Sequence, residues 1–446
     1  MIRWWRDIER WIEDGTVEAR LSGYPLLPLS ELLTQRHETV QAEVTLGDWQ
    51  PITIKFSGEV LPRERTELFK GAMFAAYPGD LVFSKIDARN GAVGLIPNTI
   101  AKAVVTSEYP VFIPNADKLR PTYLNYLLRA EHFKADLQRK ASGTSGRKRV
   151  TPDGFLGLEV PIPSLDEQDT LISSYTAALR RAEKLEHEAE AIERAGWQAF
   201  EKVLGIAPPP PLPDRPVFVA RFKDVERWSH ESILRTDNQP TVTKSDIAMI
   251  PLGQVGKVSY GIQKCPANRP GTHARPYLRV ANVQRGVLDL REIKYINVPD
   301  EEMPKLRLEV GDVLLCEGNS PDLVGRGSIW RGEIEDCVHQ NHVLRVRVDQ
   351  NRLLPEFVLV VINSGHGQAY FRSKAKRTTN LASINSKEVA GLPIPNISIT
   401  QQEKFLSALS SQIDTANFKR SEAETLRQTA WTAFVSALFT AGEVAA

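Results

Sequence analysis

The stretch from Leu171 to Val203 carries small or apolar residues at alternating intervals of four and three positions, interrupted only at Gly196. A 3.5-residue apolar repeat, sustained over roughly four heptads with charged residues between, is typical of a long α-helix packed against another helix. At about 1.5 Å per residue, such a helix reaches roughly 50 Å and cannot bury its own seam. The chain is therefore expected to contain a partner helix. The seam consists of Leu171, Tyr175, Ala178, Ala182, Leu185, Ala189, Ile192, Ala199 and Val203.

A second seam near the C-terminus supplies that partner. It begins 234 residues after the first one, and Trp197 and Phe200 reappear at the same interval as Trp431 and Phe434. Two of its positions are polar, which weakens the second helix on its own, so an intramolecular helix pair is predicted. The second seam consists of Phe405, Leu409, Gln412, Ala416, Lys419, Ala423, Leu426, Ala430, Ala433 and Ala437.

The remainder of the chain is also duplicated. Four further segments recur in the same order, at offsets from 217 to 232, and a repeat of this length has to be recognised before single motifs are interpreted. The paired segments are 6–11 with 223–228, 28–32 with 251–255, 79–83 with 311–315 and 160–163 with 392–395. In this alignment, Pro161 corresponds to Pro393.

Each half is predicted to be an α+β globular domain followed by a long helix. Short β-rich runs alternate with Gly, Pro and Asn turns, and helical patterns occur near residues 122–138 and 355–370. The expected fold is two tandem pseudo-repeated domains whose long helices form an antiparallel coiled coil. The expected bounds are 1–165 for the first domain, 166–206 for its helix, 207–216 for a Pro-rich linker, 217–397 for the second domain and 398–440 for its helix.

Composition limits the function only weakly. The 446 residues include 56 basic and 55 acidic side chains, so any basic surface must be local. Cys265, Cys316 and Cys337 are an odd number without metal-ligand spacing, which fits a reducing cytoplasm. We expect a cytoplasmic protein, because neither a signal-peptide pattern nor a run of bilayer-spanning length is found.

The sequence carries no catalytic constellation. A phosphate-binding Gly-rich loop, a nucleophile elbow and the Asn-Pro-Pro-Tyr type of tetrapeptide expected of an adenine methyltransferase are all missing. Cys337, His339 and His342 are the one compact set of potential metal ligands, but a zinc site usually needs a fourth. A strand-edge or DNA-facing role is the preferred interpretation of these histidines.

A basic cluster stands before the long helix in each half. Residues 139–149 hold five cations and no acid, and residues 372–380 hold four cations and no acid. A solvated loop explains either cluster alone, but recurrence favours a DNA contact, because Lys and Arg neutralise phosphates while Ser, Thr, Asn and Arg bind base edges. With Lys140 aligned on Arg372, the candidate DNA-binding residues are Lys140, Arg147, Lys148, Arg149, Arg372, Lys374, Lys376, Arg377 and Asn380.

A second recurring loop follows each Gly-Asp strand, at residues 84–94 and 317–327. Its glycines imply tight turns, and its polar residues differ between the halves, as two scaffolds that read different sequences would require. A purely structural hairpin is the alternative. The candidate DNA-binding residues here are Lys85, Arg89, Asn90, Asn319 and Arg326.

These motifs together resemble the specificity subunits of type I restriction-modification systems. The resemblance rests on the runs 79–86, 89–94 and 160–168 and on the duplication, and it covers essentially the whole chain. It implies a non-catalytic DNA-reading subunit whose two target recognition domains bind a bipartite site. It further implies two methyltransferase subunits docked on the coiled coil and translocase-restriction subunits, with AdoMet, ATP and magnesium bound by those partners and no cofactor in this chain. The entry into the second helix, at residues 399–403, departs from Asp166-Glu167-Gln168 and leaves the docking geometry open.

Two other interpretations remain at this point. One is a coiled-coil scaffold or antitoxin-like protein that does not bind DNA specifically. The other is a fragment of a methyltransferase-specificity fusion, against which the missing catalytic tetrapeptide counts.

Overall fold

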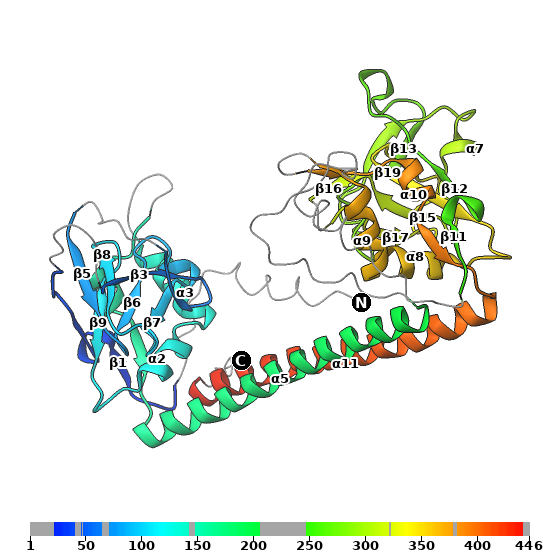
Figure 1. The fold of residues 1–446 in the computed structure, drawn as a ribbon. Coiled ribbons are helices and arrows are strands. Elements are labelled where there is room, and N and C mark those ends of the chain that lie inside the picture. Colours follow the sequence, from blue (N-terminus) through cyan, green and yellow to red (C-terminus); the bar gives the residue numbers. More distant parts are fainter. Residues whose placement is uncertain are drawn as a thin grey trace, which may run out of the picture. The chain divides into compact units, whose positions relative to one another are not determined.

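The computed structural model describes residues 22–40, 46, 48–64, 71–141, 148–205, 247–320, 323–377 and 381–439. The chain divides into two units, Met1–Glu186 with Arg420–Ala446 (unit 1) and His187–Lys419 (unit 2). Each unit therefore holds one globular domain and part of each of two long helices, α5 (Leu165–Val203) and α11 (Ile399–Leu438) (Figure 1). The segments 6–11 and 223–228 and the expected linker lie outside the described residues.

The domain of unit 1 is built on a four-stranded antiparallel sheet in the order β2-β9-β6-β7. A second sheet, β4-β3-β8-β5, contains one parallel pair, β3 with β8. The strands are β1 (Leu26–Pro28), β2 (Leu33–Gln35), β3 (Gln50–Ile54), β4 (Val60–Pro62), β5 (Met73–Ala76), β6 (Leu81–Phe83), β7 (Val93–Leu95), β8 (Ala103–Thr106), β9 (Val111–Pro114) and β10 (Glu159–Pro161). The helices are η1 (Leu29–Glu31), η2 (Ala88–Asn90), α2 (Pro121–Leu127), α3 (Glu131–Lys140) and α4 (Pro152–Leu156).

The domain of unit 2 repeats this plan. Its main sheet has the order β12-β19-β15-β17, and the sheet β14-β13-β18 again contains one parallel pair, β13 with β18. The strands are β11 (Met249–Pro251), β12 (Gly256–Ser259), β13 (Ala274–Leu278), β14 (Lys294–Asn297), β15 (Val313–Cys316), β16 (Gly318–Asn319), β17 (Gly327–Ile329), β18 (Val338–His339), β19 (Val343–Val348), β20 (Lys376–Arg377), β21 (Ala382–Ser383) and β22 (Pro393–Pro395). The helices are η4 (Leu252–Gln254), η5 (Pro266–Asn268), α7 (Met303–Leu306), α8 (Pro355–Asn363), α9 (Gly365–Lys374) and α10 (Ser386–Ala390).

The predicted α+β duplication is confirmed. The predicted alignment of segment 160–163 with segment 392–395 is wrong by two residues. Strand β10 pairs with β1 so that Pro161 lies opposite Leu26, and β22 pairs with β11 so that Pro395 lies opposite Met249. Pro161 therefore corresponds to Pro395. Each half contains Pro-Ile-Pro, so the sequence alone allows two alignments that differ by two residues. The strand pairing selects the one in which Pro161 matches the second proline of residues 393–395.

Each predicted domain helix is in fact two short helices. The segment 122–138 divides into α2 and α3, and the segment 355–370 divides into α8 and α9. At the second break, the hydroxyl of Ser364 accepts the N–H of Gly367, an N-cap that starts a new helix.

The repeated Gly-Asp pair has a structural role in both units. Asp80 is buried and accepts two hydrogen bonds from Arg36, at 2.8 and 3.0 Å, and Asp312 accepts two from Arg347, both at 2.7 Å. Each carboxylate also accepts the N–H three residues before it, at 2.8 Å. The preceding glycines have φ of +88° and +93°, which favours glycine. The Gly-Asp pair recurs because it closes the same turn in both units, immediately before strand β6 in unit 1 and strand β15 in unit 2.

Both long helices begin with the same contacts. The sequence difference between residues 399–403 and Asp166-Glu167-Gln168 therefore does not change how the helix starts. The buried amides of Gln168 and Gln402 each accept one backbone N–H at 2.8 Å and donate to two backbone carbonyls. Ser164 with Glu167 and Ser398 with Gln401 form equivalent capping contacts. Glu167 and Gln401 are thus interchangeable caps, and the buried glutamine ties each helix to its own domain.

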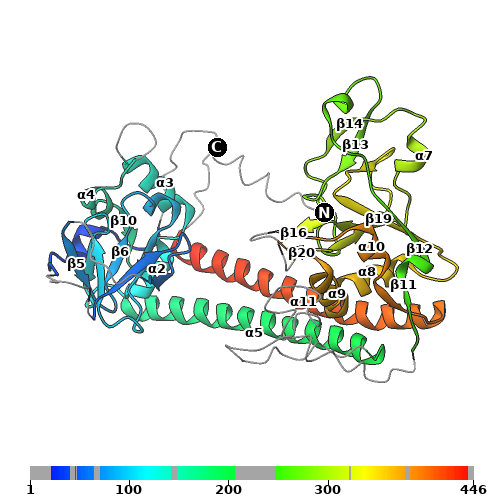
Figure 2. The same ribbon diagram turned by 45° about the horizontal axis from the view of Figure 1, so that its top comes forward.

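Within each unit the two helices run side by side in opposite directions (Figure 2). In unit 1, Ala182 and Leu185 pack with Ala423 and Leu426. In unit 2, a Cβ on Gly196 would lie 2.9 Å from the Cβ of Gln412, so glycine permits this close approach. The polar seam residue Lys419 is paired with Glu188 at 2.7 Å.

The predicted seam is wrong at the end of each helix. Ala199, Val203, Ala433 and Ala437 are exposed, while Phe200, Leu204, Phe434 and Leu438 are buried. A straight helix turns once every 3.6 residues and drifts away from a strict 3.5-residue repeat, so the buried stripe moves by one residue. Phe200 packs on Phe357 and Phe434 on Tyr123, with ring centroids 6.0 and 6.1 Å apart. Each helix pair is therefore joined to the core of a domain. Among the described residues, no helix has the length and apolar character needed to cross a membrane.

Candidate nucleic-acid interface

Two of the loops singled out in the first half meet at one junction in unit 1. The N–H of Lys85 donates to the carbonyl oxygen of Glu108 at 3.0 Å, and the N–H of Val150 donates to the carbonyl oxygen of Lys85 at 2.8 Å. Arg149 is exposed and pairs with the carboxylate of Glu108 at 3.1 Å. The loop after β6 and the end of the first basic cluster therefore form one surface, on which Lys148 is also exposed.

The remaining candidates of unit 1 lie on nearby elements. Arg89 and Asn90 belong to η2, where Asn90 is exposed and its amide donates to Asp87 at 3.5 Å. Helix α3 contacts η2 and ends at the exposed Lys140. Arg147 lies outside the described residues.

Unit 2 has the same junction with different side chains. The N–H of Glu317 donates to the carbonyl oxygen of His342, and the N–H of Ile384 donates to that of Glu317, both at 2.9 Å. Glu317 thus occupies the place of Lys85, and His342 that of Glu108. The imidazole Nδ1 of His342 donates to the Glu317 carboxylate at 2.6 Å. Unit 1 therefore places Lys85 beside Glu108 at this junction, whereas unit 2 places Glu317 beside His342.

The second basic cluster of unit 2 lies around this junction. Lys376 is exposed on β20, which pairs with β21, and β21 pairs with β16, where the side chain of Asn319 accepts the N–H of Ser320 at 2.9 Å. Arg372 and Lys374 are exposed on the last turn of α9. Helices α3 and α9 match end to end at an offset of 234, so Lys140 corresponds to Lys374 and its predicted alignment with Arg372 is wrong. The side chain of Arg377 and all of Asn380 lie outside the described residues.

Arg326 does not belong to this surface. Its side chain is buried, and its guanidinium donates to the carbonyl oxygens of Val283 and Val280 at 2.9 and 3.4 Å. A cation used to satisfy backbone carbonyls inside the domain cannot reach a base edge. The structure contradicts the prediction that Arg326 contacts DNA.

The three potential metal ligands also separate. His339 is fully buried on the edge strand β18, where Nδ1 donates to the carbonyl oxygen of Val343 at 2.6 Å. Of its two expected roles, the strand-edge role is confirmed and the DNA-facing role is wrong. Burial lowers the pKa of His339 to about 4 and raises that of Cys337 to about 12. His342 instead reaches the surface junction. Within the described ranges, no three His, Cys, Asp or Glu side chains group as a metal site would require.

Sequence reasoning missed the acidic members of the junction. Glu108 and Glu317 are absent from the predicted contacts, which are mainly cations, although a shift of 232 residues aligns Lys85 with Glu317. A carboxylate matters on such a surface, because Glu and Asp accept the N4 amino group of cytosine.

Comparison with known proteins connects this fold to one class of protein. The type I restriction enzyme StySPI specificity subunit of Salmonella potsdam is 21% identical over 281 residues, 61% of this chain and 54% of that one. The EcoKI specificity subunit of Escherichia coli K12 is 22% identical over 282 residues, covering 61% and 55%. This chain thus spans about half the length of these curated relatives. No protein-family model matches the chain.

A solved structure supports the fold over nearly the full length. A chain from a structure that describes complex assembly and conformational transition of the type I restriction-modification system aligns with a TM-score of 0.58. It is 17% identical, and the alignment covers 95% of this chain and 100% of that one. Together with the duplicated domains and paired helices, these comparisons show what the chain resembles. It is similar in sequence to specificity subunits of type I restriction enzymes, and it shares its fold with a chain of a solved type I restriction-modification structure.

Proposed function

We propose that this chain is the DNA sequence-recognition subunit of a type I restriction-modification complex, in which each unit reads one half of a bipartite, asymmetric site. The observation that carries the proposal is the junction built twice on the same backbone with different side chains. Lys85, Glu108 and Arg149 meet in unit 1, and Glu317 meets His342 in unit 2. Two equal scaffolds with unequal polar surfaces suit two different half-sites.

The residue types of the junction match the chemistry of a DNA groove. Lys and Arg side chains bind phosphates or guanine, and carboxylates accept from cytosine. The side chains of Arg149 and Glu108 are 47% and 41% exposed. An exposed ion pair contributes little to stability, so both side chains can leave it to bind DNA at little cost in free energy.

The partners follow from the same proposal. Two methyltransferase subunits dock on the helix pair, and translocase-restriction subunits join them. AdoMet, ATP and magnesium belong to those subunits, so this chain performs no catalytic step, and the complex acts on DNA in the cytoplasm. An exposed aromatic side chain offers a docking contact on α11, where Phe418 is 70% exposed.

The test is selection of duplexes from a random library by the full chain in complex with its methyltransferase subunits. We expect enrichment of one motif with two short blocks at a constant separation, and binding that weakens steeply as salt increases. A coiled-coil scaffold would enrich no motif. That result, obtained with an assembled complex, would contradict the proposal.

A further inference from the structure

A tight turn in unit 1 lies next to the candidate interface without belonging to either predicted loop. It joins β3 to β4 and is closed by hydrogen bonds from Lys55 N–H to Glu59 and from Gly58 N–H to Lys55, both at 2.9 Å. Gly58 has φ of +80°, and a Cβ there would lie 2.7 Å from the carbonyl oxygen of Val93. The turn therefore sits directly against the first residue of β7.

Unit 2 places a turn at the same position. Gln284 N–H donates to the carbonyl oxygen of Val287 at 3.0 Å, and Gly286, with φ of +75°, donates its N–H to Gly327 at 2.8 Å. Gly327 pairs with Leu315 just as Val93 pairs with Phe83, so both turns rest on equivalent strand residues. We call residues 55–59 and 284–287 the tip turns.

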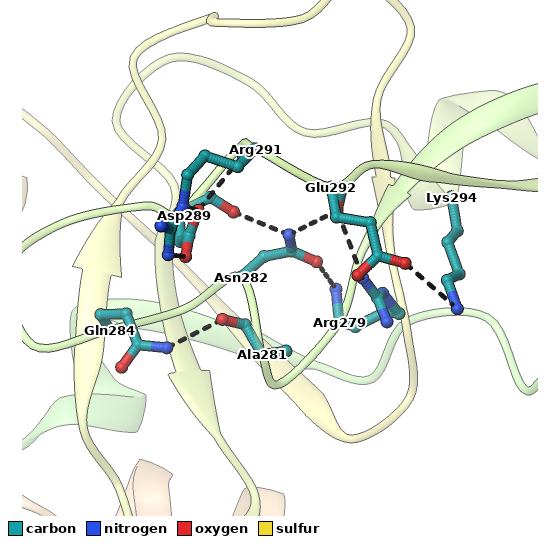
Figure 3. A network of polar contacts seen from close by, with 8 residues as sticks. All are labelled: Arg279, Ala281, Asn282, Gln284, Asp289, Arg291, Glu292 and Lys294. Atoms are coloured by element: carbon teal, nitrogen blue, oxygen red, sulfur yellow. Dashed lines mark hydrogen bonds and ion pairs between the residues drawn. The ribbon is translucent and has the colours of Figure 1, made fainter. Parts of the chain in front are cut away.

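A buried amide anchors the base of the second tip turn (Figure 3). Asn282 is 2% exposed, and its side-chain oxygen accepts the N–H of Arg279 at 2.9 Å. Its amide nitrogen donates to the carbonyl oxygens of Asp289 and Glu292 at 2.7 and 3.1 Å. The turn is therefore held at its base by the buried amide of Asn282.

Each tip turn carries one exposed apolar side chain. Phe56 is 61% exposed and Val287 is 59% exposed. Their polar neighbours are engaged locally, since Lys55 pairs with Glu59 at 3.0 Å and Arg285 donates to Gln368 at 3.0 Å. A single exposed apolar residue is ordinary on a protein surface. Both tip turns carry such a residue at different positions, since Phe56 lies two residues before Gly58 and Val287 one residue after Gly286.

The tip turns adjoin the elements that carry the candidate DNA contacts. A Cβ on Gly91 would overlap the carbonyl oxygen of Phe56, so the first tip turn touches the end of η2, next to Asn90. In unit 2, Arg285 binds Gln368 on α9, the helix that ends at Lys374. The first turn thus extends the proposed interface with an apolar element, and the second lies against the helix that carries Arg372 and Lys374.

We propose that Phe56 and Val287 are specificity-determining residues, each in contact with the C5-methyl group of a thymine in the half-site read by its own unit. The inference rests on the proposed DNA-reading function. The thymine methyl is the apolar feature that base pairs present in the major groove, and that groove admits a two-stranded β-ribbon. A hairpin end with one outward apolar side chain matches it.

The test compares the wild-type chain with Phe56→Ala and Val287→Ala, each assembled with its methyltransferase subunits. Once the half-sites are known, every thymine in turn is replaced by deoxyuridine, which lacks only the methyl group. We expect one position in each half-site where this replacement weakens wild-type binding by about fourfold, the effect of one buried methyl. Phe56→Ala should lose that sensitivity in one half-site, and Val287→Ala in the other.

The two variants are controls for each other, because each must leave the half-site of the other unit unchanged. Val310→Ala adds a surface control, since Val310 is 67% exposed in unit 2 and lies outside the tip turn. Phe56→Leu, which keeps an apolar side chain, should retain part of the sensitivity. Unchanged thymine sensitivity in both alanine variants, or no sensitive thymine in a half-site, would overturn the inference and leave the proposed function intact. A wild-type complex that selects no sequence would overturn both.

Discussion

At the scale of single residues, the structure separates side chains that maintain the fold from those available to a ligand. Asp80, Asp312 and Arg326 lie in or next to the recurring loops, yet each side chain is buried and hydrogen-bonded within its own domain. Arg149 and Lys376 carry the same kinds of charge and remain exposed. Burial and hydrogen-bond partners make the distinction, and neither can be read from residue type.

The buried carboxylate of unit 2 provides a test of its structural role. Asp312→Asn should lower the opening free energy of β15 by about 2 kcal/mol, because two charge-assisted hydrogen bonds to a buried carboxylate are lost and Arg347 keeps only its exposed partner Glu309. Amide hydrogen exchange of the β15 residues would measure it. Asp300→Asn is the matched control, since Asp300 is 70% exposed in its side chain and should change the value by less than about 0.5 kcal/mol. Equal effects would contradict the assignment.

His339 makes the stability of unit 2 depend on pH. Its pKa is lowered to about 4 by burial, whereas in the unfolded chain it titrates near 6.5. Between these values the unfolded state binds the additional proton, so stability is complete above pH 6.5 and falls as the pH decreases toward 4. We expect roughly 1 kcal/mol lost per pH unit in this window.

Hydrogen exchange of unit 2 across that pH range would measure the loss. His339→Asn keeps a donor for the carbonyl oxygen of Val343 and should remove this part of the pH dependence. An equally steep decline in the variant would show that other groups cause it.

At the scale of elements, much of the architecture could be predicted because it repeats. The heptad spacing identified both long helices, and Trp197 and Phe200 identified their relation to Trp431 and Phe434. The tip turns were not found. Gly58 and Gly286 are 228 residues apart, an interval that the other segments do not share, and the turns have few residue types in common. Only contact with equivalent strands reveals their correspondence.

The first basic cluster supports a prediction about DNA binding. Replacing Arg147, Lys148 and Arg149 with alanine should weaken binding across sequences and reduce the slope of log affinity against log salt by about 0.9 for each lost phosphate contact. The control removes three cations from α5, Arg180, Arg181 and Lys184, which are exposed outside the interface. Binding by the chain without partners at several salt concentrations measures both. An unchanged slope in the first variant would exclude a phosphate-facing role.

At the scale of the whole molecule, the two units share both long helices, so the length of these helices is expected to set the separation of the half-sites. Deleting residues 183–189 and 419–425 removes one heptad from each helix and retains the seam spacing. A heptad spans about 10 Å, and DNA rises about 3.4 Å per base pair. The recognised gap should therefore shorten by roughly three base pairs.

Both half-sequences should persist in that variant, because no residue of either interface is altered. Duplex selection before and after the deletion would measure the gap. Deleting residues 183–189 alone is the control, and it should disrupt the helix pair instead of giving a new gap. An unchanged gap in the paired deletion would rule out the helices as the spacer.

The central claim is that this chain chooses the DNA sequence on which a methyltransferase acts. The most direct measurement is to express it with its methyltransferase subunits in a host that lacks this system and to map methylated adenines across the genome. We predict a single asymmetric motif of two short blocks around a constant unspecified gap. An assembled complex, supplied with AdoMet, that adds no methylation or methylates without a motif would contradict the claim.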